Sequence, residues 1–129
     1  MTEFRTKFPQ RTGASRIWYA GLYSIKGLSG AWRNQAAFRQ EVLLALVMVP
    51  AAFWLGQGAT EQILLVGSVI LVLVVELINS AIEAVVDRIG SELHPLSGAA
   101  KDMGSAAVML CLLLALFVWV QLGIQRFGA

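Results

Sequence analysis

Cysteine, histidine and charged residues are scarce in this sequence. Its 129 residues include one cysteine and one histidine, only 14% are charged, and the net charge is +2. A single cysteine excludes an internal disulfide framework, and a low net charge without low-complexity segments is untypical of a nucleic-acid-binding module or a disordered chain. Hydrophobic residues make up 57% of the chain, whereas soluble domains carry roughly a quarter charged residues. The composition predicts one small integral membrane domain over residues 1–129.

Three apolar segments predict three transmembrane helices in an all-α protein. A helix needs about 20 residues to cross a hydrocarbon layer of roughly 30 Å, and apolar segments begin at Val42, Ile63 and Met103. With their flanks, we expect helices over 38–55, 63–88 and 101–122. Clusters of residues that break helices separate them: Gly56-Gln57-Gly58 after the first segment, and Gly90, Ser91, Pro95, Ser97 and Gly98 between the second and third.

The first of these spans is short and contains a proline. We expect Phe38 to lengthen it, with Arg39 and Glu41 reaching back to the membrane interface. Pro50 lies inside the segment. Membrane helices tolerate proline when neighbouring groups satisfy the freed carbonyl, so Pro50 predicts a kink and not a break.

Lysine and arginine residues predict the orientation, because cytoplasmic loops of membrane proteins collect them. The first loop, residues 56–62, has none, the second has Arg88 and Lys101, and the tail has Arg126. The other seven precede the first span: Arg5, Lys7, Arg11, Arg16, Lys26, Arg33 and Arg39. We therefore expect a cytoplasmic N-terminus, a cytoplasmic second loop and an external C-terminus.

Apolar side chains recur at helical spacing before the first span. At about 100° per residue they share an arc of about 120°, with Arg16 opposite and Lys26 and Arg33 at the flanks. This pattern predicts an amphipathic helix over about 15–34 that lies in the cytoplasmic interface. A short helix packed against its own protein is the alternative. The apolar residues are Trp18, Leu22, Ile25, Leu28 and Trp32.

Polar residues interrupt the second span at helical spacing. Glu76, Asn79, Glu83 and Asp87, called the polar stripe below, share an arc of about 80° at about 100° per residue. A carboxylate inside a membrane helix costs roughly 2.5 to 3.5 kcal/mol on insertion scales, so such residues are functional candidates. The alternative is that they join helices by hydrogen bonds, with small residues nearby permitting close approach.

Carboxylates in a row repel one another and need positive charge nearby. Mg²⁺ suits this role, because it takes a few carboxylates and keeps substrate phosphate oxygens as further ligands. Lys101 is either a topological anchor or a phosphate ligand. The small residues 104–107 after it permit helix packing or ligand access. We expect Cys111 to be a packing residue and His94 to be a solvated side chain in a loop.

The residues of the polar stripe carry a family resemblance. Residues 76–88 read ELINSAIEAVVDR, which resembles the signature of the small bacterial integral-membrane diacylglycerol kinases. The flanking runs are similar to the same family: AAFRQE at 36–41, LSG at 96–98 and KDMGSAA at 101–107. The resemblance covers the chain from about Arg16 to Ala107.

The resemblance implies a homotrimeric, multi-pass enzyme of the bacterial inner membrane with three transmembrane helices and an amphipathic surface helix per chain. It implies transfer of the γ-phosphate of MgATP to the hydroxyl of diacylglycerol, giving phosphatidic acid, at sites between subunits. Glu76 would be the base that receives the hydroxyl proton, and Glu83 would hold Mg²⁺ and nucleotide. The other matching positions around substrates and phosphates are Asn79, Lys101, Asp102, Arg16 and Lys26.

Two positions depart from the family pattern. Gln35 stands where a second metal-associated glutamate is usual, and Ala99 stands where an arginine is frequent. An amide oxygen still coordinates Mg²⁺ but brings no charge, so Gln35 predicts weaker metal and nucleotide binding. Three other functions remain open: an undecaprenol kinase of the same family, a small oligomeric proton or cation conduit, and a structural membrane assembly protein. The conduit is disfavoured by Lys101 near Asp87, because an ion relay does not need a positively charged side chain that binds phosphate.

Overall fold

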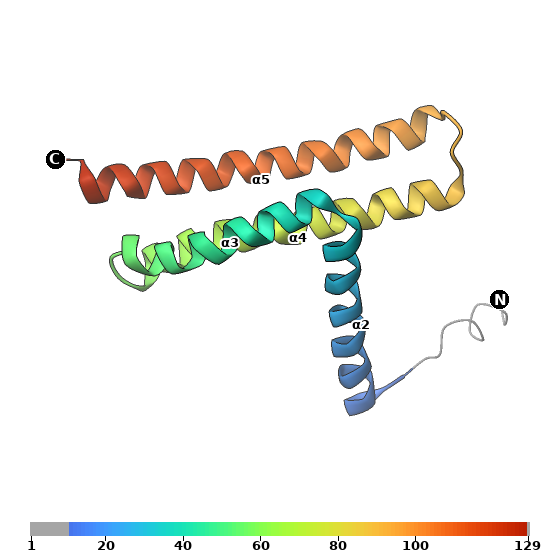
Figure 1. The fold of residues 1–129 in the computed structure, drawn as a ribbon, viewed down its shortest axis with the longest axis horizontal. Helices are drawn as coiled ribbons and strands as arrows, with labels where there is room; N and C mark the ends of the chain where they lie inside the picture. The colour runs from blue at the N-terminus through green and yellow to red at the C-terminus, as the bar shows by residue number, and fades with distance from the viewer. Residues whose placement is uncertain (1–10, 129) are drawn as a thin grey trace. The chain divides into compact units, whose positions relative to one another are not determined.

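The computed structural model describes residues 11–128, and these residues form four α-helices joined by short loops. The helices are α2 (Gly13–Asn34), α3 (Ala36–Leu55), α4 (Ala59–Ile89) and α5 (Pro95–Phe127) (Figure 1). Three of them, α3, α4 and α5, are long and apolar enough to cross a membrane. The all-helical fold with three candidate spans is therefore confirmed. Arg5 and Lys7, used above for the orientation, lie outside the described residues.

The chain divides into two compact units, one ending at Gly30 and one beginning at Ala31. The first contains most of α2, which begins at Gly13 with a positive φ of 63°. The guanidinium of Arg11 lies 3.5 Å from the centre of the Tyr19 ring. Trp18 and Ile25 of the predicted apolar stripe are exposed. The predicted helix is present, and its position in the membrane interface stays a prediction.

In the second unit, α4 packs against both α3 and α5, whereas α3 and α5 touch at few points. The turn after α3 and the end of α5 lie at one end of this unit, and the loop between α4 and α5 lies at the other (Figure 1). Ala52, Leu55 and Leu65 form a buried apolar cluster near the α3–α4 turn. The helix α3 continues through Pro50, so the absence of a break is confirmed.

One side-chain hydrogen bond joins α4 and α5 beside this cluster. Trp119 Nε1 donates to Ser68 Oγ at 3.2 Å, and Ser68 Oγ donates to the Leu65 carbonyl at 2.9 Å. Ser68 is buried, so both bonds are shielded from solvent. The first bond links α5 to α4, and the second, within α4, orients the Ser68 hydroxyl.

The start of α5 corrects the predicted boundary. Pro95, Ser97 and Gly98, expected in a loop, belong to the first turns of α5, which begins six residues before the expected Lys101. Proline suits the first position of a helix because it lacks the N–H that would stay unpaired there. His94 Nδ1 accepts a hydrogen bond from the Leu96 N–H at 3.1 Å and so caps the helix. His94 is exposed, as expected, but also has this structural role.

Candidate active site

The polar stripe lies on the packed face of α4 and changes from buried to exposed along the helix. Buried side chains recur along α4 at spacings of three and four residues, and Glu76 and Asn79 are among them, with 6% and 7% of their surface exposed. Glu83, about two turns beyond Glu76, is partly buried, and Asp87 is exposed. The predicted common face is confirmed, and the stripe leads from the interior of the helix bundle to its surface.

Glu76 has a carboxyl neighbour on another helix. The Glu41 carboxyl group on α3 lies close enough to that of Glu76 for the two to interact electrostatically. The second oxygen of Glu41, Oε2, is buried and has no partner. The Glu41 side chain therefore lies beside Glu76, and its reach to the membrane interface stays a prediction.

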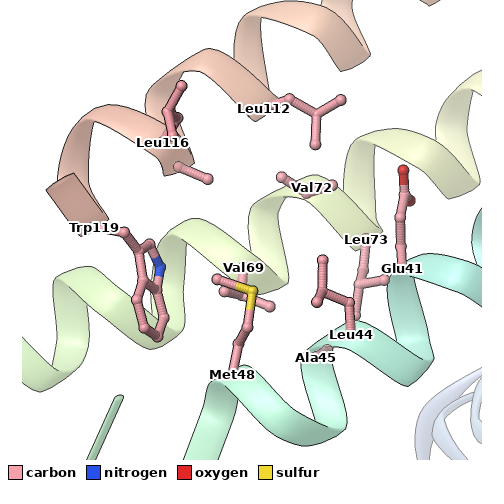
Figure 2. A pocket seen from close by; sticks show the side chains of 11 residues that line it. Glu41, Leu44, Ala45, Met48, Val69, Val72, Leu73, Leu112, Leu116 and Trp119 are labelled. Atoms are coloured by element: carbon pink, nitrogen blue, oxygen red, sulfur yellow. The ribbon is translucent and has the colours of Figure 1, made fainter. Parts of the chain in front are cut away.

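An apolar cavity of about 230 Å³ adjoins Glu41. Figure 2 shows Glu41 at one end of the lining side chains and Trp119 at the other. All three helices of the second unit contribute apolar residues between them, among them Leu44 and Met48 of α3, Val69 and Val72 of α4, and Leu112 and Leu116 of α5. The cavity is therefore an apolar space with one acidic side chain at its end.

Asn79, in the middle of the polar stripe, contacts Glu83 on α4 and Gly104 on α5. Its Nδ2 donates to Glu83 Oε1 on the same helix at 3.3 Å. Its Oδ1 is buried and has no hydrogen-bond partner, and it lies against Gly104 of α5. Side-chain hydrogen bonds between α4 and α5 come instead from Trp119 with Ser68 and from Lys101 with Asp87. Asn79 thus makes no hydrogen bond to another helix, but Asp87 of the same stripe accepts one from α5, so the alternative that stripe residues join helices stays open.

Lys101 closes the exposed end of the polar stripe. Its Nζ donates to Asp87 Oδ1 at 2.9 Å, and both side chains are exposed. Glu83 adds to the negative potential at the ammonium group. The structure therefore brings together Glu76, Asn79, Glu83 and Lys101 with Asp87, while Asp102 lies exposed next to Lys101. A cation at this end is available to an anionic ligand that arrives from solvent.

The chain matches a known protein family over most of its length. The profile of the prokaryotic diacylglycerol kinases matches residues 22–122. This chain belongs to that family. The diacylglycerol kinase of Escherichia coli K12 is 56% identical over 117 residues, which cover 91% of this chain and 96% of the relative. The Haemophilus influenzae enzyme is 48% identical, covering 84% and 92%, and that of Helicobacter pylori J99 is 42% identical, covering 92% of each.

The resemblance inferred from residues 76–88 is thus confirmed, together with the enzyme class of the family. The three apolar helices and the bacterial relatives make this diacylglycerol kinase family member a bacterial membrane protein. The individual roles of the site residues stay predictions. Arg16 and Lys26 lie exposed on α2, in the first unit. Gln35 stands at the N-cap of α3 and makes no side-chain capping bond.

The part of the stripe around Glu83 supplies some of the ligands that a magnesium ion needs. Glu83 is a partly buried carboxylate, and Mg²⁺ is usually held by one or two carboxylates together with water and phosphate oxygens. Residues 11–128 contain no group of three or more histidine, cysteine, aspartate or glutamate side chains that could hold a metal ion. One chain therefore supplies few ligands, and substrate phosphates or a second chain would have to supply the rest.

Proposed function

We propose that this chain transfers the γ-phosphate of ATP to the hydroxyl of diacylglycerol, giving phosphatidic acid and ADP, in the bacterial inner membrane. The observation that carries the proposal is the position of Glu76. This carboxyl group is buried beside Glu41, which lines one end of an apolar cavity, and it lies on the helix face that also presents Glu83. Membership of the prokaryotic diacylglycerol kinase family supports the same reaction.

Glu76 acts as the general base in this proposal. The lipid hydroxyl oxygen attacks the γ-phosphorus, the hydroxyl proton passes to Glu76, and ADP leaves with the electrons of the broken phosphorus–oxygen bond. A base in a largely apolar site accepts a proton readily. The apolar cavity beside Glu41 supports access for a lipid chain from the hydrocarbon side. The carboxyl pair then lies where the polar end of that lipid would be.

The nucleotide binds at the exposed end of the stripe in this proposal. Phosphoryl transfer requires positioning and neutralisation of charge more than covalent catalysis. Bound Mg²⁺ would neutralise charge on the transferred phosphate, with Glu83 and Gln35 as its protein ligands. Lys101 contacts phosphate oxygens, and Asn79 orients the Glu83 carboxylate through their hydrogen bond. The further nucleotide-binding residues that we propose are Asp102, Arg16 and Lys26.

We further propose a homotrimer with a cytoplasmic N-terminus. The small number of metal ligands in one chain supports sites that are shared between neighbouring chains. The distribution of lysine and arginine supports the orientation. It puts the exposed end of the stripe on the cytoplasmic side, where ATP is available.

The test is phosphate incorporation from ATP into two lipid alcohols, dioleoylglycerol and undecaprenol, in mixed micelles. The proposal expects incorporation into dioleoylglycerol and almost none with the Glu76→Gln variant. Preference for undecaprenol would assign the other kinase activity. A folded oligomer that phosphorylates neither lipid would refute the proposal, and cation flux through liposomes without ATP consumption would then support the conduit.

A further inference from the structure

Gly104 is the point at which α5 meets the side chain of Asn79. Within residues 11–128, it is the one buried residue of α5. A Cβ atom added at Gly104 would overlap Asn79 Oδ1 and would also lie 3.1 Å from Asn79 Cγ. The other glycines of the same helix differ, because a Cβ added at Gly98 or Gly123 would meet nothing within 4 Å.

The contact limits the direction in which the Asn79 amide can point. Oδ1 faces α5 at Gly104 and has no hydrogen-bond partner, while Nδ2 faces Glu83 and donates to its Oε1. The amide of a buried asparagine has few ways to turn without leaving its N–H groups unsatisfied, which is unfavourable. A side chain at position 104 would displace the amide from this arrangement.

We propose that Gly104 is a positioning residue: the absence of a side chain there lets Asn79 hold the Glu83 carboxylate in the orientation used for catalysis. The catalytic part of this inference rests on the proposed function. Groups that orient a metal-binding carboxylate typically change metal affinity or activity by roughly 10- to 100-fold when they are removed. Gly104 never touches the substrate and acts only through Asn79 and Glu83.

The first experiment observes Asn79 directly and needs no enzyme activity. The chain contains two asparagines, Asn34 and Asn79, so selective ¹⁵N-asparagine labelling gives two side-chain amide signals in an NMR spectrum of the full chain in detergent. Gly104→Ala is expected to shift the Asn79 signal and leave that of Asn34 in place. The matched control, Gly98→Ala, is expected to shift neither. An unshifted Asn79 signal in Gly104→Ala would overturn the proposal.

The second experiment is a double-mutant cycle in the phosphorylation assay. Gly104→Ala is expected to lower kcat/KM for MgATP roughly 10- to 100-fold, with KM for dioleoylglycerol unchanged and Gly98→Ala like wild type. In the Asn79→Ala background, Gly104→Ala is expected to cause no further loss. An equal loss in that background would overturn the proposal, because Gly104 would then act without Asn79.

Folding is measured in the same four variants. If Gly104→Ala does not fold, the proposal expects the Asn79→Ala/Gly104→Ala double variant to fold, because the smaller residue 79 leaves room. Failure of that double variant, with Asn79→Ala folded, would overturn the proposal. A wild-type chain without kinase activity would refute the proposed function alone, since the NMR experiment would still decide the role of Gly104.

Discussion

The two ends of the polar stripe on α4 are held in different ways. At the inner end, Glu76 and Asn79 are buried and contact residues of both neighbouring helices, Glu41 on α3 and Gly104 on α5. At the outer end, Asp87 is exposed and its partner is the exposed Lys101. Packing surrounds the inner groups, whereas a solvent-exposed ion pair with its hydrogen bond joins the outer groups. Substitutions at the inner end should therefore cost much more than those at the outer end, since exposed ion pairs contribute about 0–1 kcal/mol.

The largest effect is expected for Glu76→Gln. The amide keeps the shape of the side chain but cannot accept the lipid proton, so kcat should fall roughly 10²- to 10⁴-fold, the usual contribution of a general base. Phosphate incorporation into dioleoylglycerol measures this loss. Unfolding of the variant in detergent should resemble that of wild type. If Glu76→Gln keeps most of its activity, Glu76 is a packing residue and the inner end has no catalytic role.

The next largest effect is expected for Glu83→Gln, in the middle of the stripe. An amide there still accepts the hydrogen bond from Asn79, but it loses the charge that would attract the metal and its nucleotide. We expect KM for MgATP to rise roughly 10- to 100-fold, with little change in KM for dioleoylglycerol. Steady-state kinetics with each substrate varied in turn separate the two constants. Equal changes in both would contradict a role confined to the nucleotide.

A smaller effect is expected for Asp87→Asn at the outer end. The change removes the ion pair with Lys101, and an energy of at most about 1 kcal/mol corresponds to a change in kcat/KM for ATP of no more than about fivefold. The difference should shrink in about 1 M salt, where exposed charges are screened. Glu92→Gln, which removes the same charge from an exposed loop residue, is the matched control. A loss as large as that of Glu76→Gln would remove the contrast between the two ends.

Gln35→Glu should improve metal use by a modest amount. The substitution restores a negative charge at the start of α3, and Mg²⁺ prefers carboxylate to amide ligands. We expect the Mg²⁺ concentration that gives half-maximal activity to fall severalfold, with Gln40→Glu, an exposed position on the same helix, as the control. An unchanged Mg²⁺ dependence would show that Gln35 lies outside the metal site.

Much of the fold could be predicted because apolar periodicity and residue spacing are local. The three apolar segments and the common face of Glu76, Asn79 and Glu83 follow from spacing alone. The start of α5 was missed, because residues such as Pro95 and Gly98 are typical of loops, whereas proline at a first helical position and the His94 cap extend the helix instead.

The position of Glu41 could not be read from composition. It follows Arg39 and Gln40 and precedes an apolar run, so neighbouring residues do not mark the side of α3 that packs. The buried residues Phe38, Ala45 and Ala52 recur every seven positions, and Glu41 falls between the first two on the same face. That spacing is a signal, but it becomes readable only when the packed face is known. The contact of Gly104 with Asn79 depends on how closely two helices approach, which spacing within one helix does not determine.

The smallest effect is expected for the bond between α4 and α5 that lies outside the polar stripe. Trp119→Phe removes the donor to Ser68, and Ser68→Ala removes the acceptor. Double-mutant cycles on hydrogen bonds between membrane helices average about 0.6 kcal/mol and reach about 1.7, so we expect a coupling free energy of unfolding in this range, measured in mixed micelles. A coupling near zero would mean that this bond does not help to hold α4 against α5. Close contacts such as that of Asn79 with Gly104 would then carry more of the positioning of the stripe's inner end.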